Sequence, residues 1–476
     1  MPLKVFNTLN QRIEVFKPLR DNAVGIYVCG PTVYDYSHVG HARTYIAFDI
    51  IVRHLRYKGF EVKYVVNITN IDDKIINRAK ELKKDPLKLA EKFEEAFFDD
   101  IRALRIKQAD VYPKVTDHIP EIIEMIQTLI EKGFAYVVNG DVYFSVKKVT
   151  DYGKLSHQSL EEVKAGARSD SSEKKVFPVD FALWKSSKPE EPGWDSPWGK
   201  GRPGWHIECS VMSMKYLGPQ FDIHGGAQDL IFPHHENEIL QSEAASGKKP
   251  FVKYWLHTGF LNVGGKKMSK SLGNIIPIGE LLEKYSAEEF RLFVLSAHYR
   301  SPINFTYESL NQARKNLEKL YNLIHKINAL VKEQKKEKTD IEEDRFYKEL
   351  EDQKQKFLEA MDEDFNTPLA LKHLFAIMRK ANTYFGGMVE VSKELLNRVL
   401  GLFSELGGIL GILERVREAP EELPEELAKL IGEREEARKS KDWETADRIR
   451  LHLRELGIIL EDAPEGVRWR RKHRGN

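Results

Sequence analysis

Cysteine is scarce in this chain: only Cys29 and Cys209 occur among 476 residues. A secreted scaffold held by disulfides carries many more, so the sequence favours a reducing, cytoplasmic compartment. Two thiols far apart in the sequence can still meet in space as metal ligands. No apolar run approaches the ~18 residues that a membrane span needs, and the amino-terminal segment lacks the apolar centre of a signal peptide. We therefore expect neither a membrane protein nor a secreted one.

An excess of charge of either sign is also missing. Lys and Arg number 74 and Asp and Glu 73, which gives a net charge of +1. The total charge therefore identifies no partner, although a local basic patch can still exist. The chain is too long for a single core, because cores stop growing near ~250–300 residues. Its length predicts about three domains of ~150 residues each.

The first part of the chain has a strand–helix–strand pattern. Residues 24–28 form a short apolar run typical of a buried parallel strand, residues 41–57 have helical spacing, and residues 62–68 alternate as a second strand. Parallel sheets of this kind bind nucleotides in the loop after the first strand. We predict an α/β fold with a Rossmann-type parallel-sheet catalytic domain over residues 1–309.

The rest of the chain divides by composition. Residues 118–203 contain short strand-like runs among Gly, Ser and Pro and predict an insertion into the catalytic domain. Residues 310–417 have apolar side chains at helical spacing and predict an α-helical bundle, with the charged run 332–345 as a solvated turn or helix end. The acidic, proline-containing segment 418–426 predicts a linker. A helix and a hairpin then predict a small mixed α/β module, so that the linker and module together occupy residues 418–476.

A candidate metal site lies in the run from Pro233 to Glu238. If Pro233 begins a helix, His234 and Glu238 share one face of it, four residues apart. Adding Cys29 and Cys209 gives a ligand set that Zn²⁺ accepts. His235 could replace His234 as the ligand. A surface His–Glu pair and two ordinary buried thiols fit the spacing equally well.

Two histidines, His38 and His41, flank Val-Gly at the predicted start of the first helix. Backbone N–H groups and the helix dipole favour phosphate at such a position. Imidazoles there can donate hydrogen bonds to a phosphate whose charge grows during a reaction. A polar helix cap or a satisfied core pair is the alternative interpretation.

Two glycine-containing segments are further candidates. Lys267 and Lys270 lie in a run with glycine on both sides, which predicts a mobile loop whose ammonium groups can reach a phosphate. Gly225 and Gly226 follow a predicted strand and let a ligand approach the backbone, which would place Asp229 near ribose hydroxyls. A solvated loop explains the first segment equally well, and a glycine pair alone is weak evidence.

The carboxyl-terminal residues 466–476 contain four Arg and one Lys with no acid, beside Trp469. Cations next to an aromatic ring suit single-stranded RNA, whose bases stack on the ring. A disordered basic terminus is the alternative.

Together and in this order, the motifs resemble those of class I aminoacyl-tRNA synthetases. The His38–His41 run, HVGH, resembles the HIGH signature, and residues 267–271 match the KMSKS signature letter for letter. The runs YVCGPTVYD at residues 27–35, GWHIEC at 204–209 and FPHHENE at 232–238 resemble the cysteinyl-tRNA synthetase family in particular. DFNTP at residues 364–368 and WRRK at 469–472 extend the resemblance over essentially the whole chain.

The resemblance implies one Zn²⁺ per chain, with the thiolate of the substrate cysteine as a further ligand. Pocket shape discriminates poorly between serine and cysteine, whereas a thiolate is a far better zinc ligand than an alcohol. An editing domain is then unnecessary. The implied zinc ligands are Cys29, Cys209, His234 and Glu238, and the implied cysteine pocket contains Cys29, Thr69, Trp205 and His206.

The resemblance also implies the reaction. L-cysteine is activated with ATP and Mg²⁺ to cysteinyl-adenylate and transferred to the 3′-terminal ribose of tRNA(Cys), chemistry that depends on positioning and charge stabilisation. The implied catalytic residues are His38, His41, Lys267 and Lys270; Gly40, Gly226 and Asp229 join His38, His41 and Lys270 in binding ATP. The implied RNA contacts are Trp469, Arg470, Arg471 and Lys472. Such enzymes are usually monomers.

Two positions depart from the pattern: Asn70 stands where Asp is expected, and Ala227 replaces a third glycine. The main alternative is the related cysteine–aminosugar ligase, which uses the same adenylate chemistry but lacks the small anticodon module. A zinc-bearing RNA-binding regulator without catalysis is a second alternative, but it would not need both nucleotide signatures.

Overall fold

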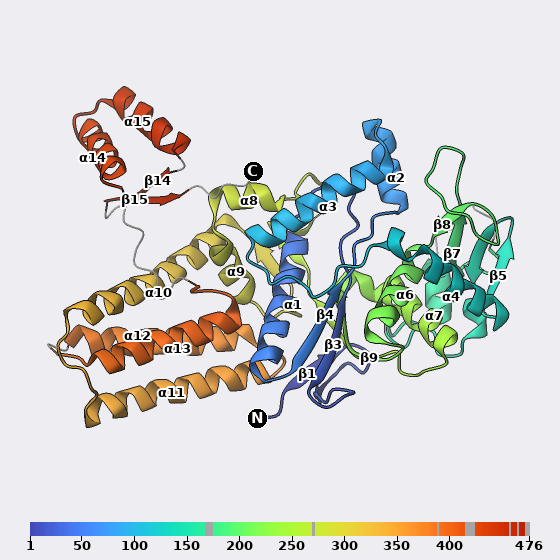
Figure 1. Cartoon of the computed structure of the whole chain (residues 1–476), viewed down its shortest axis with the longest axis horizontal. Coiled ribbons are helices and arrows are strands. Elements are labelled where there is room, and N and C mark those ends of the chain that lie inside the picture. Colours follow the sequence, from blue (N-terminus) through green and yellow to red (C-terminus); the bar gives the residue numbers. More distant parts are fainter. Residues whose placement is uncertain are drawn as a thin grey trace.

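The computed structural model describes residues 1–166, 175–268, 272–387, 390–414, 424–456, 458–463 and 466–471. Figure 1 shows a central sheet with helices, a lobe around β5–β8 on the right, and long helices on the left. The chain enters through the antiparallel strands β1 (Lys4–Asn7) and β2 (Arg12–Val15). Within the described residues, no helix is both long and apolar enough to cross a membrane.

The central sheet is parallel and has the order β10-β9-β3-β4, which confirms the predicted Rossmann-type fold. Residues of β3 alternate between two cores. Val24, Ile26 and Val28 belong to the core shared with α1, whereas Tyr27 and the following Cys29 belong to the core shared with α6. The elements are β3 (Ala23–Val28), β4 (Glu61–Val66), β9 (Phe221–Ala227), β10 (Val252–Thr258), α1 (Val39–Tyr57), α6 (Trp205–Leu217) and α7 (Glu236–Ser246).

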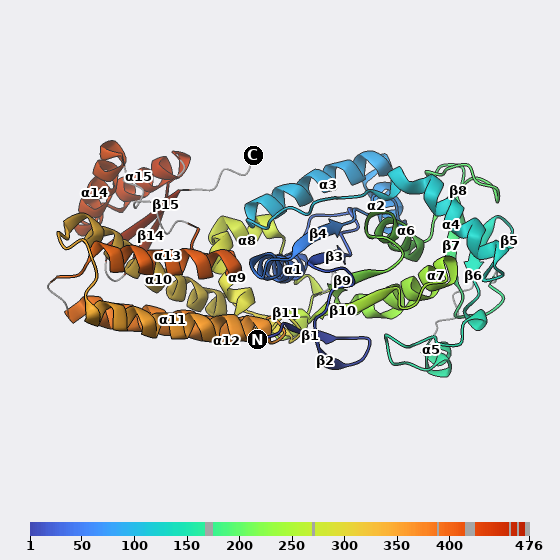
Figure 2. The ribbon, with the colours of Figure 1, turned by 60° about the horizontal axis from the view of Figure 1, so that its bottom comes forward.

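Further helices and short turns complete this region. Figure 2 shows α3 above α1, and side chains of both helices belong to one core, whereas α2 contributes side chains to both large cores. The short hairpin of β11 and β12 pairs with β13 in a separate three-stranded sheet. The elements are α2 (Asp73–Leu82), α3 (Pro86–Ala103), β11 (Leu261–Val263), β12 (Lys266–Lys267), α8 (Ile278–Lys284), α9 (Ala287–Leu295) and β13 (Ile303–Phe305).

Between α3 and α6 the chain forms its own antiparallel sheet, in the order β5-β6-β7-β8. The inner strands of this sheet, at residues 141–144 and 181–186, are two of the strand-like runs that the sequence indicated within 118–203. The elements are η1 (Val115–His118), α4 (Ile119–Glu131), β5 (Ala135–Val138), β6 (Asp141–Phe144), η2 (Val146–Lys148), α5 (Leu160–Gly166), β7 (Phe181–Ser186) and β8 (Gly201–Pro203).

Pro233 begins a helical run, as predicted, because the kink in the chain lies at Phe232 and the residues after it are helical and continue into α7. Two short turns, η3 (Gln228–Leu230) and η4 (Ile231–His235), precede α7, which begins at Glu236. Phe232 has an extended backbone, with φ −134° and ψ 133°, because a residue before proline avoids the helical region. His234 and Glu238 are therefore four residues apart in one helical run and lie on the same side of it.

Long helices form the left part of the molecule: α10 (Tyr307–Glu333), α11 (Ile341–Asp362), α12 (Thr367–Gly387) and α13 (Lys393–Leu410). The apolar face predicted in α10 is buried, and it includes Leu310, Leu317 and Ile324. The charged run 332–345 contains the turn at 334–340, as predicted, but a further helix, α11, follows it directly. Charged residues separate the buried Phe346, Leu350 and Phe357 of α11, which obscures its apolar stripe in the sequence.

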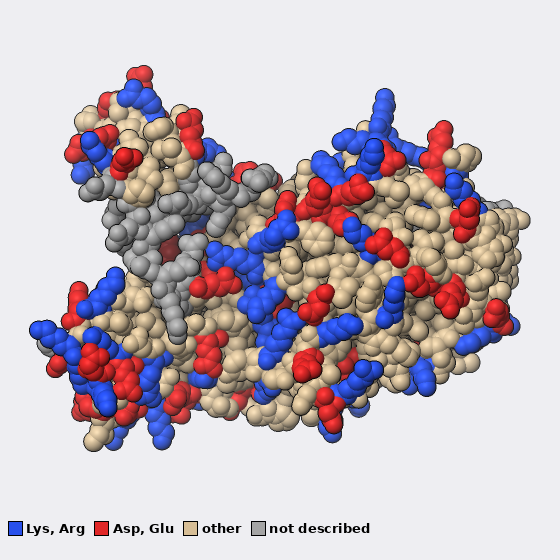
Figure 3. Space-filling view, viewed as in Figure 1, with Lys and Arg blue, Asp and Glu red and all other residues tan. Residues whose placement is uncertain are grey.

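The carboxyl-terminal module has a small core of its own that includes Leu453 and Leu460. It contains α14 (Glu425–Lys439), α15 (Trp443–Glu455), β14 (Ile458–Ala463) and β15 (Gly466–Arg471). The sequence predicted α15 and the hairpin but not the charge-rich α14. Most of the predicted linker at 418–426, and the tip of the predicted hairpin turn, lie outside the described residues. Figure 3 shows both signs of charge interspersed over the visible face, in keeping with the balanced total.

Candidate active site

The carboxyl ends of the central strands meet the start of α1 around a cavity of about 310 Å³. Ligands bind at this edge in open α/β sheets, because loops diverge there from the ends of the strands. The cavity brings together residues from every catalytic motif that the sequence indicated, which are Cys29, His38, Gly40, His41, Thr69, Trp205, Cys209, Asp229, His234 and Lys267.

At the start of α1, the His38 and His41 rings stack with their centroids 3.8 Å apart. Nδ1 of His38 accepts the N–H of Gly40 at 3.2 Å, and Nδ1 of His41 accepts the N–H of His38 at 3.4 Å. A neutral imidazole that accepts at Nδ1 carries its proton at Nε2. Each ring therefore carries its proton at Nε2.

The electrostatics around His41 keep its ring neutral. Burial, reinforced by the nearby His38 and Lys74, lowers the pKa of His41 to about 3. A methyl group on Gly40 would lie 2.6 Å from the Met268 side chain and 3.0 Å from the His38 ring. Glycine therefore allows the histidine pair and the Lys267 hairpin to approach each other.

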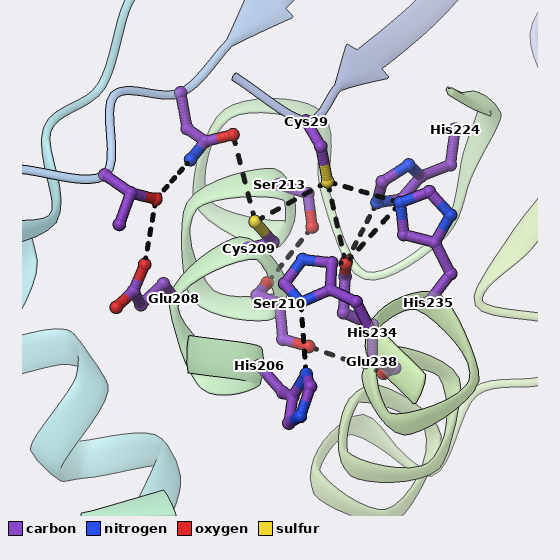
Figure 4. Close-up of polar contacts among 12 residues, drawn as sticks. Cys29, His206, Glu208, Cys209, Ser210, Ser213, His224, His234, His235 and Glu238 are labelled. Carbon is purple, nitrogen blue, oxygen red and sulfur yellow. Dashed lines mark hydrogen bonds and ion pairs between the residues drawn. The ribbon is translucent and has the colours of Figure 1, made fainter. Parts of the chain in front are cut away.

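Four side chains from separate parts of the chain converge at the base of the cavity: Cys29 after β3, Cys209 in α6, His234 in η4 and Glu238 in α7. One ligand atom from each lies within 4.8 Å of the others, and all four residues are buried. The two Sγ atoms are 3.8 Å apart, and Nε2 of His234 is 2.9 Å from Oε1 of Glu238. Figure 4 shows these side chains pointing toward one another.

In this centre the negative charge of Glu238 and the positive charge of His234 stabilise each other. Burial works against the carboxylate of Glu238, but His224 and His234 outweigh it and lower the Glu238 pKa to about 2. Burial also works against protonated His234, but Glu238 and Cys209 raise its pKa to about 10. The donor set of two thiols, an imidazole and a carboxylate matches the soft and borderline ligands that Zn²⁺ prefers. The residues present therefore fit a zinc ion.

A second histidine layer lies behind this centre. Nε2 of His224 is 2.8 Å from Oε2 of Glu238, and Nε2 of His235 is 3.2 Å from the Cys29 Sγ. Cys29, His224, His235 and Glu238 thus form a second group compatible with a metal, which keeps His235 open as an alternative ligand. Nδ1 of His235 lies 2.8 Å from Nε2 of His257, which fixes the orientation of its ring.

The predicted cysteine-pocket residues lie around the centre. The Trp205 and His234 rings are 4.3 Å apart, and Thr69 donates a hydrogen bond of 3.1 Å to Glu208. His206 lies against His234 through a 3.0 Å contact between the two Nδ1 atoms. Trp205 and Thr69 line the cavity of about 310 Å³, whereas His206 faces a second cavity of about 660 Å³ beside the insertion, which Trp205 also lines.

The predicted nucleotide residues lie at the outer end of the cavity. Lys267 lies in β12, with Nζ 4.2 Å from the Phe260 ring centroid, and Asp229 lies in the turn after β9. Gly226 is in β9, one residue before Ala227, whose methyl group belongs to the cavity wall. Lys270 lies outside the described residues.

Several residues of the site were not found from the sequence. Lys74 lines both cavities, and its Nζ is 5.8 Å from the Trp205 ring centroid. The Asn67 side-chain oxygen accepts the N–H of Gly30 at 2.8 Å and lies 3.8 Å from the Cys209 Sγ. The polar run after β4, which contains Asn67 and Thr69, was a usable signal. Asn70 points away and bonds to Thr116 at 2.8 Å.

The predicted RNA contacts lie at the end of the carboxyl-terminal hairpin. Trp469, Arg470 and Arg471 belong to β15, where Trp469 pairs with Leu460 of β14. Lys472 lies outside the described residues.

Comparison with known proteins gives matches along the chain. Residues 15–315 match the model of the class I tRNA synthetase (C) catalytic domain, residues 356–414 the DALR domain, and residues 421–470 the cysteinyl-tRNA ligase anticodon-binding domain. The chain is 52% identical over 474 residues to a cysteine–tRNA ligase of Thermococcus gammatolerans, and the match covers 99% of each chain. A cysteine–tRNA ligase of Heliobacterium modesticaldum is 51% identical over 480 residues, covering 99% of this chain and 100% of the relative.

Solved structures show the same fold at low identity. Methionyl-tRNA synthetase of Mycobacterium tuberculosis with methionyl-adenylate superposes with a TM-score of 0.63 at 17% identity, covering 82% of this chain and 93% of that one. A leucyl-tRNA synthetase complex of Agrobacterium radiobacter gives a TM-score of 0.60 at 12% identity, covering 86% of this chain and 88% of that one.

Proposed function

The chain belongs to the cysteine–tRNA ligase family, and we propose that the buried Cys29–Cys209–His234–Glu238 centre is where this enzyme selects the cysteine that it activates with ATP and attaches to tRNA. The observation that carries the proposal is the shared cavity. A buried metal-ligand set lies at its base, and both nucleotide signatures contribute to its wall.

The centre is proposed to hold one Zn²⁺. When bound, Zn²⁺ supplies a soft Lewis acid that favours a thiolate over an alcohol and lowers the pKa of a thiol. The chain's own residues shape the rest of the pocket. Trp205 covers the centre, and its contact with the His234 ring limits the size of the side chain that can enter. Asn67 and Thr69 hold one wall through a 3.2 Å hydrogen bond.

At the other end of the cavity, His38 and His41 are proposed to bind the α-phosphate of ATP. Their Nε2–H groups lie on the opposite side of each ring from the Nδ1 atoms, which accept backbone N–H groups. The donors are fixed before the reaction, so they stabilise charge on the phosphate without reorganising. The low pKa of His41 keeps this ring neutral, so it donates a hydrogen bond but no proton.

Lys267 and Lys270 are proposed to hold the charge of the departing pyrophosphate, which enters with Mg²⁺ as its counterion. Gly40, Gly226 and Asp229 are proposed to border the nucleotide. Asp229 lines the cavity and is proposed to lie near the adenosine.

The tRNA(Cys) partner is proposed to bind along the helices and the carboxyl-terminal module, with Trp469, Arg470, Arg471 and Lys472 at the anticodon. We propose the division into residues 1–309, 310–417 and 418–476, with the insertion at 118–203, and a cytoplasmic monomer. The cysteine–aminosugar ligase alternative lacks an anticodon module, whereas residues 421–470 match the model of that module.

The experiment that tests the selection centre is replacement of a ligand. Cys209→Ser should lower bound zinc from one ion per chain to near zero. Because the centre would then lack a soft donor, it should also lower cysteine-dependent pyrophosphate exchange by at least about 100-fold. Zinc is measured by atomic absorption and activity by exchange and by charging of tRNA(Cys) with serine as competitor. Ser213→Ala, buried one turn further along α6, serves as the matched control. Full zinc content and normal exchange in Cys209→Ser would refute the assignment.

A further inference from the structure

We propose that Asp364 is a positioning residue for ATP: through the loop at residues 298–301, it fixes the hairpin that carries Lys267 relative to His38 and His41. Asp364 opens the DFNTP run, which the reaction itself does not use. The inference rests on the proposed role of Lys267 at the phosphates.

Asp364 joins three parts of the chain through one buried carboxylate, which is 1% exposed. Oδ1 accepts the Phe6 N–H of β1 at 2.8 Å and the Tyr299 hydroxyl at 2.9 Å. Oδ2 accepts Nε of Arg300 at 2.6 Å and lies 3.6 Å from Nε2 of His298. The carboxylate therefore fastens the turn between α11 and α12 to the loop that follows α9.

The backbone at Asp364 is held in a conformation that is costly for such residues. Its φ is +57°, and that of Phe365 is +53°. Two consecutive left-handed residues other than glycine cost of order 1–3 kcal/mol each and persist only when the surroundings enforce them. The turn is thus built to aim this carboxylate at the loop.

The loop at 298–301 supports the Lys267 hairpin directly. It leads into β13, whose residues 303–305 pair in parallel with residues 261–263 of β11. The Gly259 N–H donates to the Tyr299 carbonyl at 2.9 Å, and the Ile303 N–H donates to the Phe260 carbonyl at 2.9 Å. Phe260 is the ring over which the Lys267 Nζ lies.

Arg43 connects the same loop to the histidine pair. This residue of α1 is 2% exposed and lies two positions after His41. Its guanidinium donates to the carbonyls of Gly259 at 2.7 Å and Tyr299 at 3.3 Å, and also to that of Ser301. A shift of the loop therefore changes the place of Lys267 with respect to the start of α1.

A neighbouring carboxylate provides the matched control. Asp362, 3% exposed, is the last residue of α11, two positions before Asp364, and binds Nε2 of His54 and Nζ of Lys58, each at 2.9 Å. These partners lie at the end of α1, about 20–26 Å along the helix axis from His41 at ~1.5 Å per residue. Asp362 thus joins the same helices to the catalytic domain without touching the loop at 298–301.

The experiment compares Asp364→Asn with Asp362→Asn in the full-length, zinc-loaded enzyme. Cysteine-dependent pyrophosphate exchange gives KM for ATP and for cysteine, and thermal unfolding gives Tm. We expect Asp364→Asn to raise the ATP KM about tenfold, with the cysteine KM and zinc content within twofold of wild type. Asp362→Asn should lower Tm to a similar degree and leave both KM values within twofold. An unchanged ATP KM in Asp364→Asn, or an equal rise in Asp362→Asn, would overturn the proposal.

Two further variants keep the test decisive. Tyr299→Phe removes a single hydrogen bond to Asp364 and should raise the ATP KM about threefold even if Asp364→Asn fails to fold; no change there would count against the proposal. The variant Lys267→Ala tests the proposed role of Lys267 at the phosphates separately from the proposed role of Asp364. If this variant leaves the ATP KM unchanged, the proposed role of Lys267 is wrong. If Lys267→Ala raises the ATP KM, the double variant Lys267→Ala/Asp364→Asn should have an ATP KM within twofold of that of Lys267→Ala. A tenfold higher ATP KM in the double variant would show that Asp364 does not act through Lys267.

Discussion

At the scale of single residues, the site works through rings whose protonation is fixed by their surroundings. The sequence indicated His38 and His41 as phosphate ligands, but it could not indicate which nitrogen carries the proton. That follows from Nδ1 contacts with the backbone at the start of α1. Lys74 was missed for a related reason: it is one of 74 basic residues, and only folding brings α2 to the cavity.

The neutral His41 predicts a dependence of stability on pH. An unfolded histidine takes up a proton below about pH 6.5, whereas the folded pKa is about 3. Its contribution to stability is therefore complete above pH 6.5 and is lost as the pH falls toward 3, with a slope of at most about 1.4 kcal/mol per pH unit for one proton. The amide of His41→Asn can still accept the His38 N–H. The decrease in Tm between pH 7 and pH 5, measured by calorimetry, should thus be smaller for this variant than for wild type. An equal decrease in the two proteins would contradict the lowered pKa of His41.

At the scale of elements, regular patterns were predictable and irregular ones were not. The parallel strands and α1 followed from apolar spacing, because β3 is buried on both faces. Pro233 was recognisable as a helix start because its fixed φ suits the first helical turn, whereas the turn η3 and the kink at Phe232 before it were not predicted. The charge-rich α11 and α14 were not found, since tertiary contacts stabilise them more than their own periodicity indicates.

The contact between β9 and α1 gives a prediction at this scale. A methyl group on Gly225 would lie 2.0 Å from the Phe48 ring, which is fully buried on α1. Gly225→Ala should therefore force the helix away from the sheet and lower the free energy of unfolding by about 1–3 kcal/mol. Gly408→Ala in α13 has nothing within 4 Å of the added methyl group and should be neutral or stabilising by about 0.5–1 kcal/mol. Denaturant unfolding measures the free energy of unfolding of both variants. Equal values would show that α1 can move away from β9 at no cost in stability.

At the scale of the whole molecule, the cavity and the carboxyl-terminal module are separate parts of the structure. The cavity lies in the central region, while the carboxyl-terminal module has its own small core. The order of these parts was predictable because each has its own composition and spacing. The contacts between distant segments, such as Asp364 with β1, could not be predicted without the fold.

Removal of residues 419–476 should separate the two activities. Because both large cores lie outside this segment, cysteine-dependent pyrophosphate exchange should stay within about threefold of the full chain. Charging of tRNA(Cys) should fall by at least about 100-fold, since anticodon contacts would be lost. Equal retention of both activities would show that the carboxyl-terminal module does not bind tRNA.

The convergence of Cys29 with Glu238 has a consequence for synthesis of the chain. Their contact joins positions 209 residues apart, so the four-residue centre cannot close until about half of the protein has left the ribosome. At ~5–20 residues per second, Cys29 waits for roughly 10–40 s without its partners. During that time its thiol depends on the reducing environment for protection, and closure of the four-residue centre requires that β3 and β9 have come together, although β10 has still to leave the ribosome.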